Sequence, residues 1–282
     1  MSSRDGALFS MNDHAQFLAT YSEVPVQRRT DGRVSAAHDR VAEEVPLALI
    51  YNGIPHVVMM ASPADIEDFA LGFSLSEAVI ATPSQLRAVE TDQVGGGIAV
   101  YMDIDEKRAL ALESQRRNLA GRTGCGLCGA ETIEQAVRHP ASVGTGVRIA
   151  LQALHSALAQ LVDRQELNAK TGAVHAAAWA TSDGELVAVR EDVGRHNALD
   201  KMIGALARES RSFDQGFALI TSRASFEMAQ KAATVGVTAL VAISAPTGLA
   251  IRLAQETGLT LIGFARGRQC NVYANPQRLI ST

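Results

Sequence analysis

The chain has 282 residues, of which 47% are hydrophobic and 20% charged, and its net charge at pH 7 is −4. This composition is that of a folded protein with one large domain or two moderate ones, and the slight negative charge gives no overall attraction to nucleic acid or to an anionic membrane. No apolar run reaches the roughly 20 residues of a membrane-spanning helix. Because the N-terminus lacks a secretory signal and the chain has only three cysteines, we expect a cytoplasmic protein with neither nucleic acid nor membrane as partner.

The first part of the chain divides by pattern into an arm and a small folded portion. Residues 1–40 are polar and without sustained periodicity, which predicts a flexible N-terminal arm. Residues 41–120 favour an α+β portion, in which apolar runs around Asn52-Gly53 predict a β-hairpin. Ser62 would cap a helix, two further strands are expected over Leu86–Glu90 and Ile98–Ile104, and residues 105–131 are charged and then glycine-rich.

Strands and helices alternate through residues 132–282, which predicts a mixed α/β sheet covered by helices. The expected strands are Ala173–Ala180, Glu185–Arg190, Phe217–Thr221, Ala239–Ser244 and Thr260–Phe264, and the expected helices are Thr132–His139, Val147–Leu167, Asn197–Arg208, Ser225–Val235 and Leu249–Glu256. In folds of this kind functional loops follow the carboxyl ends of the strands.

Two of the three cysteines form a Cys125-x-x-Cys128 pair among glycines, in a loop over 121–131 that we expect to be mobile. Such a pair could accept sulfur as a persulfide, cycle through a disulfide, bind a metal, or lie on the surface without a role. A zinc site would need further ligands, and the chain has no second Cys-x-x-Cys pair. A thioredoxin-like site would need a following long helix. We therefore favour a reactive thiol and expect no metal.

Polar and basic residues gather at three predicted strand ends. Arg195 and His196 lie in a charged turn before a helix, where helix N–H groups favour anions, although the same turn could simply be solvated. Ser222 and Arg223 follow the next strand. The stretch 264–269 follows the last strand and brings two more arginines. Together they predict a crevice for phosphate or pyrophosphate.

His175 lies where a zinc deaminase would carry a His-x-Glu motif, but position 177 is alanine. Deaminase chemistry would therefore lack its general acid and base. A half-buried, hydrogen-bonded histidine is the plainer interpretation of this residue.

The chain resembles the FdhD-type formate dehydrogenase accessory sulfurtransferases. The resemblance is carried by TGCGLCGAE (123–131), TGAVHAAA (171–178), VREDVGRHNALDK (189–201), SRASFEMAQKA (222–232), SAPTGLAIRLAQETGLTLIGFARG (244–267) and NVYANPQRL (271–279).

This resemblance implies a cytidine-deaminase-like α/β fold and a role in maturing formate dehydrogenase. A cysteine desulfurase would pass sulfur to Cys125 as a persulfide, with Cys128 as its companion. The sulfur would then go to the bis(molybdopterin guanine dinucleotide) cofactor before the cofactor enters the catalytic subunit of formate dehydrogenase. The residues that the resemblance implies for cofactor binding are Phe264, Ala265, Arg266, Gly267, Arg268 and Gln269.

Two other functions are compatible with the sequence. The protein could be a chaperone that binds the cofactor and uses its cysteines only for docking, or a zinc-dependent deaminase-like enzyme. A homodimer is compatible with this fold class, although no heptad or apolar stripe in the sequence marks an interface.

Overall fold

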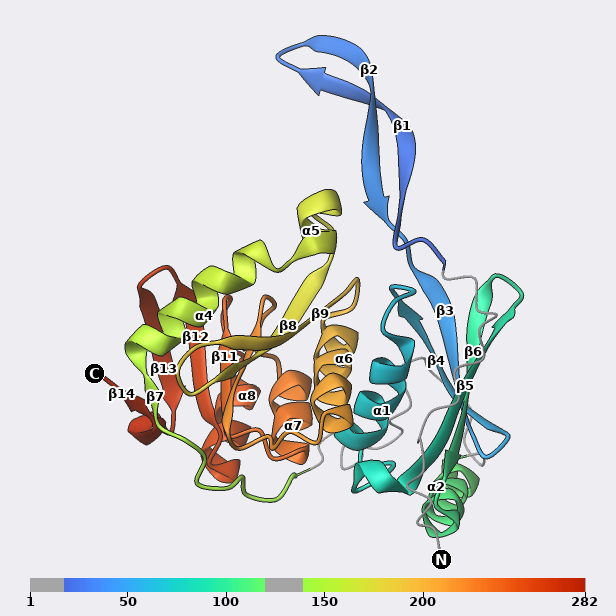
Figure 1. Cartoon of the computed structure of the whole chain (residues 1–282), viewed down its shortest axis with the longest axis vertical. Coiled ribbons are helices and arrows are strands. Elements are labelled where there is room, and N and C mark those ends of the chain that lie inside the picture. Colours follow the sequence, from blue (N-terminus) through green and yellow to red (C-terminus); the bar gives the residue numbers. More distant parts are fainter. Residues whose placement is uncertain (1–17, 120–138, 282) are drawn as a thin grey trace, which may run out of the picture.

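The computed structural model describes residues 18–119 and 139–281 and shows a mixed α/β protein, as the sequence predicts (Figure 1). The strands are β1 Tyr21–Thr30, β2 Arg33–Ala42, β3 Val45–Tyr51, β4 Ile54–Ala61, β5 Leu86–Val94, β6 Gly97–Ile104, β7 Ile149–Ala150, β8 His175–Thr181, β9 Leu186–Asp192, β10 Gly216–Ile220, β11 Ala239–Ala242, β12 Thr260–Arg266, β13 Gln269–Ala274 and β14 Leu279–Ile280. The helices are α1 Ile66–Ser76, α2 Glu106–Leu119, α4 Leu151–Asp163, α5 Glu166–Thr171, α6 Arg195–Arg208, α7 Phe226–Thr234 and α8 Gly248–Thr257, with short 3₁₀ turns at Pro83–Gln85 and Pro276–Arg278.

A four-stranded sheet in the order β4-β3-β6-β5 forms the N-terminal part of the body. The predicted hairpin is present, with Asn52 and Gly53 at positive φ between β3 and β4. The predicted cap is wrong, because Ser62 is used elsewhere: its hydroxyl accepts a hydrogen bond from the backbone of Val193 at 3.1 Å. Helix α1 begins later, at Ile66.

A six-stranded sheet in the order β13-β12-β11-β10-β8-β9 forms the C-terminal part. Strands β10, β11 and β12 are parallel, whereas β8 is antiparallel to β10, and the hairpin β8–β9 closes one edge. Helix α4 packs on one face through Leu154, Leu158 and Leu161, while α6, α7 and α8 cover the other. The alternation that the sequence predicts is therefore confirmed.

The two parts meet where α1 crosses α6, and the crossing is close because each helix has a glycine at the contact. A Cβ atom on Gly72 would lie 1.7 Å from the carbonyl oxygen of Asp200, and one on Gly204 would lie 1.8 Å from that of Asp68. The backbones can approach this closely only without side chains at these two positions. In Figure 1, α1 lies between the four-stranded sheet and α6.

Buried charges reinforce this junction. Lys201 and Asp192, both 0% exposed, form an ion pair at 2.7 Å. The Asp192 carboxylate also accepts hydrogen bonds from the backbone of Ser62 at 3.0 Å and of Gly194 at 2.7 Å, and from the side chain of Asn197 at 2.9 Å. One carboxylate therefore joins the segment before α1 to the start of α6.

Helix α7 carries a second buried cation, Lys231. Lys231 contacts Asp200 and Glu77, each at 2.8 Å, and donates to Ser76 at 3.0 Å. Burial opposes the positive charge, but the attraction of the two carboxylates outweighs it and raises the pKa of Lys231. This cluster joins α1, α6 and α7.

Three regions differ from the sequence-based expectations. Residues 21–40 of the predicted arm belong to an antiparallel hairpin, Tyr21–Ala42, whose two strands have ten residues each, rather than to irregular chain. Its turn places Asp31 and Gly32 at φ values of 49° and 78°, a conformation that an Asp-Gly pair favours. Helix α2 forms in the charged part of 105–131, where the sequence pattern predicts neither helix nor strand.

The long helix expected over Val147–Leu167 is interrupted. A second helix, α5, begins after α4 because the carboxylate of Glu191 caps its N-terminus. This carboxylate accepts hydrogen bonds from the backbone N–H of Leu167 at 2.8 Å and of Asn168 at 2.9 Å. The loop 121–131 and all of the expected helix Thr132–His139 except His139, which is not helical, lie outside the described residues. The division at residues 40, 120 and 131 stays a prediction.

Candidate functional site

The carboxyl ends of β9, β10, β11 and β12 lie at one edge of the six-stranded sheet, together with the start of β8. Three of these strands lead directly into helices: β9 into α6, β10 into α7 and β11 into α8. The first N–H groups of three helices therefore lie along this edge, where they favour a negatively charged ligand. We call this edge, with the loops 193–196, 221–225, 243–247 and 264–268, the crevice edge.

Backbone hydrogen bonds hold these loops against one another. The N–H of Ala224 donates to Ala245 at 3.2 Å, and the N–H of Thr247 donates back to Ala224 at 3.0 Å. The N–H of Phe264 donates to Ser244 at 3.1 Å. The three loops are consequently a connected backbone surface.

Arginines from separate loops bring positive charge to the crevice edge. Arg223, Arg266 and Arg268 are exposed, and the Nε of Arg266 donates to the carbonyl of Ile243 at 3.1 Å. The Nε of Arg195 is buried and has no hydrogen-bond partner in the described structure. A buried donor without a partner costs free energy. An oxyanion bound near Arg195 would give its Nε the hydrogen bond that it lacks.

Two histidines share this region. The pKa values of His175 and His196 are both lowered, chiefly by burial and then by the nearby cationic Arg195. Both imidazoles are therefore neutral at pH 7 and can donate or accept hydrogen bonds. The Nε2 of His196 lies 3.2 Å from Glu227, whose carboxylate also accepts from Ser225 at 3.1 Å.

The stretch 264–269 comprises the end of β12, the two-residue turn at 267–268 and the first residue of β13. Phe264 has φ of 51°, which is unusual for an aromatic residue, and its side chain is 42% exposed. Ala265 is buried, whereas Gly267 and Gln269 are exposed. The backbone therefore presents an aromatic ring beside Arg266 and Arg268, a combination suited to a stacked base and its phosphates.

The structure brings the predicted binding residues together at the crevice edge. Other residues of the charged motif 189–201 lie elsewhere, in the junction between the two parts. His175, Arg195, His196, Ser222 and Arg223 all lie along the crevice edge with the 264–269 turn, although Ser222 is buried and its hydroxyl donates to the carbonyl of Arg223 at 3.1 Å. Asp192, Asn197, Asp200 and Lys201 are buried in the junction between the two parts. The sequence analysis did not assign Glu227 to the site, although its spacing from Ser225 is visible in the sequence.

Cys125 and Cys128 lie outside the described residues. Cys270 is partly buried on β13, and burial raises the pKa of its thiol, so it is a poor nucleophile. Within residues 18–119 and 139–281, no three His, Cys, Asp or Glu side chains are arranged to hold a metal. None of the helices in these ranges is long and apolar enough to cross a membrane.

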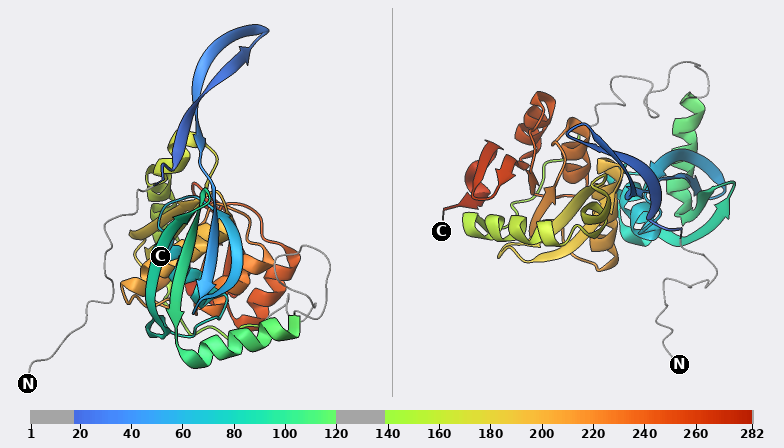
Figure 2. Two further views of the ribbon diagram at one scale, coloured as in Figure 1. Left: turned by 90° about the vertical axis from the view of Figure 1, so that its right-hand side faces the viewer. Right: turned by 90° about the horizontal axis from the view of Figure 1, so that it is seen from above.

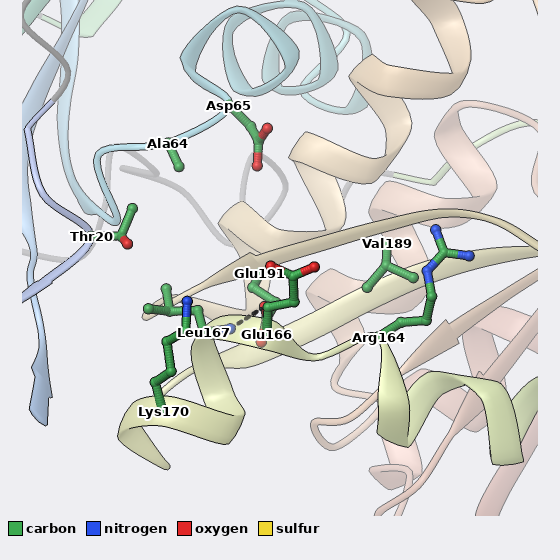
Figure 3. Close-up of a pocket in the computed structure, with 9 residues that line it drawn as sticks. All are labelled: Thr20, Ala64, Asp65, Arg164, Glu166, Leu167, Lys170, Val189 and Glu191. Atoms are coloured by element: carbon green, nitrogen blue, oxygen red, sulfur yellow. Dashed lines mark hydrogen bonds between the residues drawn. The ribbon is translucent and has the colours of Figure 1, made fainter.

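A separate polar hollow of about 280 Å³ lies between the base of the β1–β2 hairpin, α5 and β9 (Figure 3). Of its three acids, Asp65, Glu166 and Glu191, the last already caps α5. Lys170 belongs to the same hollow and lies 5.4 Å from the ring centre of Tyr21. The hollow is thus a joint between the hairpin and the body rather than part of the crevice edge.

Comparison with known proteins matches this chain to relatives over most of its length. The FdhD/NarQ family profile matches residues 42–280. Proteins named "Sulfur carrier protein FdhD" from Xanthomonas campestris pv. campestris and from Cupriavidus necator are 55% and 52% identical over 254 and 260 residues, which is 90% and 92% of this chain and 90% of each relative.

A solved structure has the same fold. The crystal structure of a protein described as a formate dehydrogenase accessory protein from Desulfotalea psychrophila superimposes with a TM-score of 0.76 and covers 93% of this chain and 100% of that one. The two sequences are 22% identical.

Proposed function

The chain belongs to the FdhD/NarQ family, and from this membership we propose that it is a sulfur carrier needed for formate dehydrogenase activity. Cys125 accepts sulfur from a cysteine desulfurase as a persulfide. The protein then delivers that sulfur to the bis(molybdopterin guanine dinucleotide) cofactor, held at the crevice edge, before the cofactor enters the catalytic subunit.

The observation that carries this proposal is the chemistry of the crevice edge. A dinucleotide cofactor of this kind carries pyrophosphates and guanine bases. Arg195, Arg223, Arg266 and Arg268 supply forked donors for the phosphates, and the unpartnered Nε of Arg195 fits the same purpose. The exposed ring of Phe264 offers a face for a base.

Sulfur transfer to Cys125 balances without an added reductant. The Cys125 thiolate attacks the outer sulfur of the donor persulfide, a new S–S bond forms on Cys125, and the donor leaves as a thiolate. Delivery of the outer sulfur as sulfide needs two electrons. Attack of the Cys128 thiolate on the inner sulfur supplies them, and leaves a Cys125–Cys128 disulfide.

Intact-mass analysis after incubation with a cysteine desulfurase and cysteine tests the proposal. The wild type is expected to gain the mass of one sulfur atom, and Cys125→Ala to gain none. Cys128→Ala is expected to load but not to release, and Cys270→Ala, the matched control, to load like the wild type. If no form gains sulfur with an active desulfurase, the protein is instead a cofactor-binding chaperone.

Arginine substitutions test the binding part separately. Arg266→Ala and Arg268→Ala are each expected to weaken guanosine diphosphate binding about 10- to 100-fold, because each removes a charge-assisted hydrogen bond to phosphate. Isothermal titration calorimetry provides the dissociation constants. Arg87→Ala, which changes a surface arginine of the four-stranded sheet, is the control. If both crevice variants bind guanosine diphosphate as tightly as the wild type, the nucleotide does not bind at Arg266 and Arg268.

We also propose that the six-stranded sheet and its helices form a cytidine-deaminase-like scaffold. A cytidine-deaminase-like scaffold is supported by the β8–β9 hairpin beside the parallel strands β10, β11 and β12, and by helices α6 and α7 that begin beside His175. Ala177 stands where deaminase chemistry needs a carboxylate. The scaffold would then serve binding rather than deamination.

A further inference from the structure

Arg195 differs from the other arginines of the crevice edge, because part of its guanidinium group is buried and unpaired. Its Nε atom has no hydrogen-bond partner in the described structure, and no carboxylate of the described residues lies within ion-pair distance of it. By contrast Arg190, on β9, contacts the carboxylate of Asp68 at 2.7 Å. A buried cationic donor that lacks both kinds of partner is expected to bind an anion.

The surroundings of Arg195 fix its position and leave its charge uncompensated. The backbone N–H of Gly194, directly before it, donates to the buried carboxylate of Asp192 at 2.7 Å, which holds the turn in place. His175 and His196 lie close enough to Arg195 for its charge to contribute to lowering the pKa of both imidazoles. These neutral rings supply hydrogen-bonding groups around the cation without cancelling its charge.

Helix α6, which begins at Arg195, adds backbone donors at the same place. Its N-cap residue, Gly194, has no side chain that could accept a hydrogen bond from the first N–H groups of the helix. Nearer to the 264–269 stretch, the side chain of Thr247 caps α8 by accepting from the N–H of Ala250. The N-terminus of α6 is therefore open to an anion beside Arg195, whereas that of α8 is partly occupied.

Arg195 lies far along the crevice edge from the 264–269 stretch. The strand order is β13-β12-β11-β10-β8-β9, and Arg266 is held at β11, where its Nε donates to the carbonyl of Ile243 at 3.1 Å. Three strand spacings, about 14 Å in all, separate β11 from β9. A single phosphate group is small compared with this spacing, whereas a nucleoside diphosphate that is extended along the edge spans it.

We propose that a guanosine diphosphate group of the cofactor lies along the crevice edge with its base at Phe264 and its terminal phosphate at Arg195. The first phosphate, next to the ribose, then lies between these two residues, within reach of Arg266 and Arg268. This inference rests on the proposed function, which places the cofactor at this edge, and adds the direction in which the cofactor lies.

The direction determines where the rest of the cofactor is held. The pterin and the metal are attached through the terminal phosphate, so they extend past Arg195 and beyond β9. In Figure 2, right, the six-stranded sheet runs from β12 and β13 (red) to β8 and β9 (yellow), and the four-stranded part (blue to green) lies beyond β9. The sulfur is therefore delivered at the β9 end of the crevice edge, beside the junction between the two parts.

Isothermal titration calorimetry of the full chain with guanosine monophosphate and guanosine diphosphate tests this direction. The wild type is expected to bind the diphosphate about 10- to 100-fold more tightly, because the terminal phosphate gains charge-assisted hydrogen bonds from a buried donor. Arg195→Met is expected to bind the monophosphate like the wild type but to prefer the diphosphate by less than about threefold. Arg266→Ala is expected to weaken both nucleotides equally and so to keep the preference.

The control is Arg87→Met, which removes an exposed arginine that pairs with Asp105 on the four-stranded part and is expected to change neither affinity. Unchanged binding of the monophosphate shows that Arg195→Met is folded. The proposal is overturned if Arg195→Met keeps the full preference for the diphosphate, or if Arg266→Ala alone loses it, which would place the terminal phosphate at the 264–269 stretch. A wild type that binds neither nucleotide would overturn the nucleotide site of the proposed function together with this inference.

Discussion

Gly204→Ala is expected to destabilise the protein by about 3 kcal/mol, near the upper end for overpacking a tight contact. The new methyl group would lie 1.8 Å from the carbonyl oxygen of Asp68, so α1 and α6 would have to separate. That separation would also disturb the buried ion pairs beside the crossing. Gly72→Ala, on the other helix, is expected to have a similar effect.

Urea unfolding measures this change. Circular dichroism reports the whole protein, and the fluorescence of Trp179, the single tryptophan, reports the six-stranded sheet. Gly248→Ala is the control, because its Cβ would lie 3.6 Å from its nearest neighbour, a side-chain atom of Arg252. That variant is expected to be neutral or more stable by up to about 1 kcal/mol, since alanine favours a helix. Equal stability of Gly204→Ala and wild type would mean that the two helices do not depend on this contact.

Lys201→Met is expected to cost about 3–5 kcal/mol, because it leaves the carboxylate of Asp192 buried without its cation. Lys201 and Asp192 are both completely buried, and Lys201 also donates to the carbonyl of Ser62 at 3.0 Å. Guanosine diphosphate binding should weaken as well, because Asp192 holds Gly194 immediately before Arg195.

The double variant Asp192→Asn with Lys201→Met separates charge from packing. It is expected to recover about half of the loss, since neither buried group then carries a net charge. Arg211→Met, at an exposed ion pair with Glu209, is the control and should cost less than about 1 kcal/mol. If Lys201→Met costs no more than this control, the buried pair does not hold the two parts together.

The sequence predicted the strands and helices of the C-terminal part because buried apolar runs such as Phe217–Ile220 and Ala239–Ala242 are unambiguous. It did not predict the role of Asp192 and Lys201. These residues lie in a turn rich in charge, and only the fold brings Ser62, about 130 positions earlier, into hydrogen-bonding distance. Hydrogen bonds between residues so far apart in the chain are not marked by any local sequence pattern.

The arm was missed for a different reason. Its strands are largely exposed, so they lack the alternation of buried and exposed residues that marks a strand. The pair Asp31-Gly32 is a local hairpin signal, but the prediction of a flexible arm did not take it into account. The crevice edge was predictable in outline because loops after parallel strands meet at one edge, whereas the contact between His196 and Glu227 depends on how α6 and α7 pack.

The crossing of α1 and α6 also has a consequence for synthesis on the ribosome. Helix α1 is complete at Ser76, but the helix that covers it begins only at Arg195. At about 5–20 residues per second, the intervening chain takes on the order of 10 s to emerge. During that interval the face of α1 at Gly72, which contacts Asp200 and Gly204 of α6 in the finished protein, has no helix against which to pack. On the nascent chain this face of α1 is therefore uncovered until α6 has been synthesised.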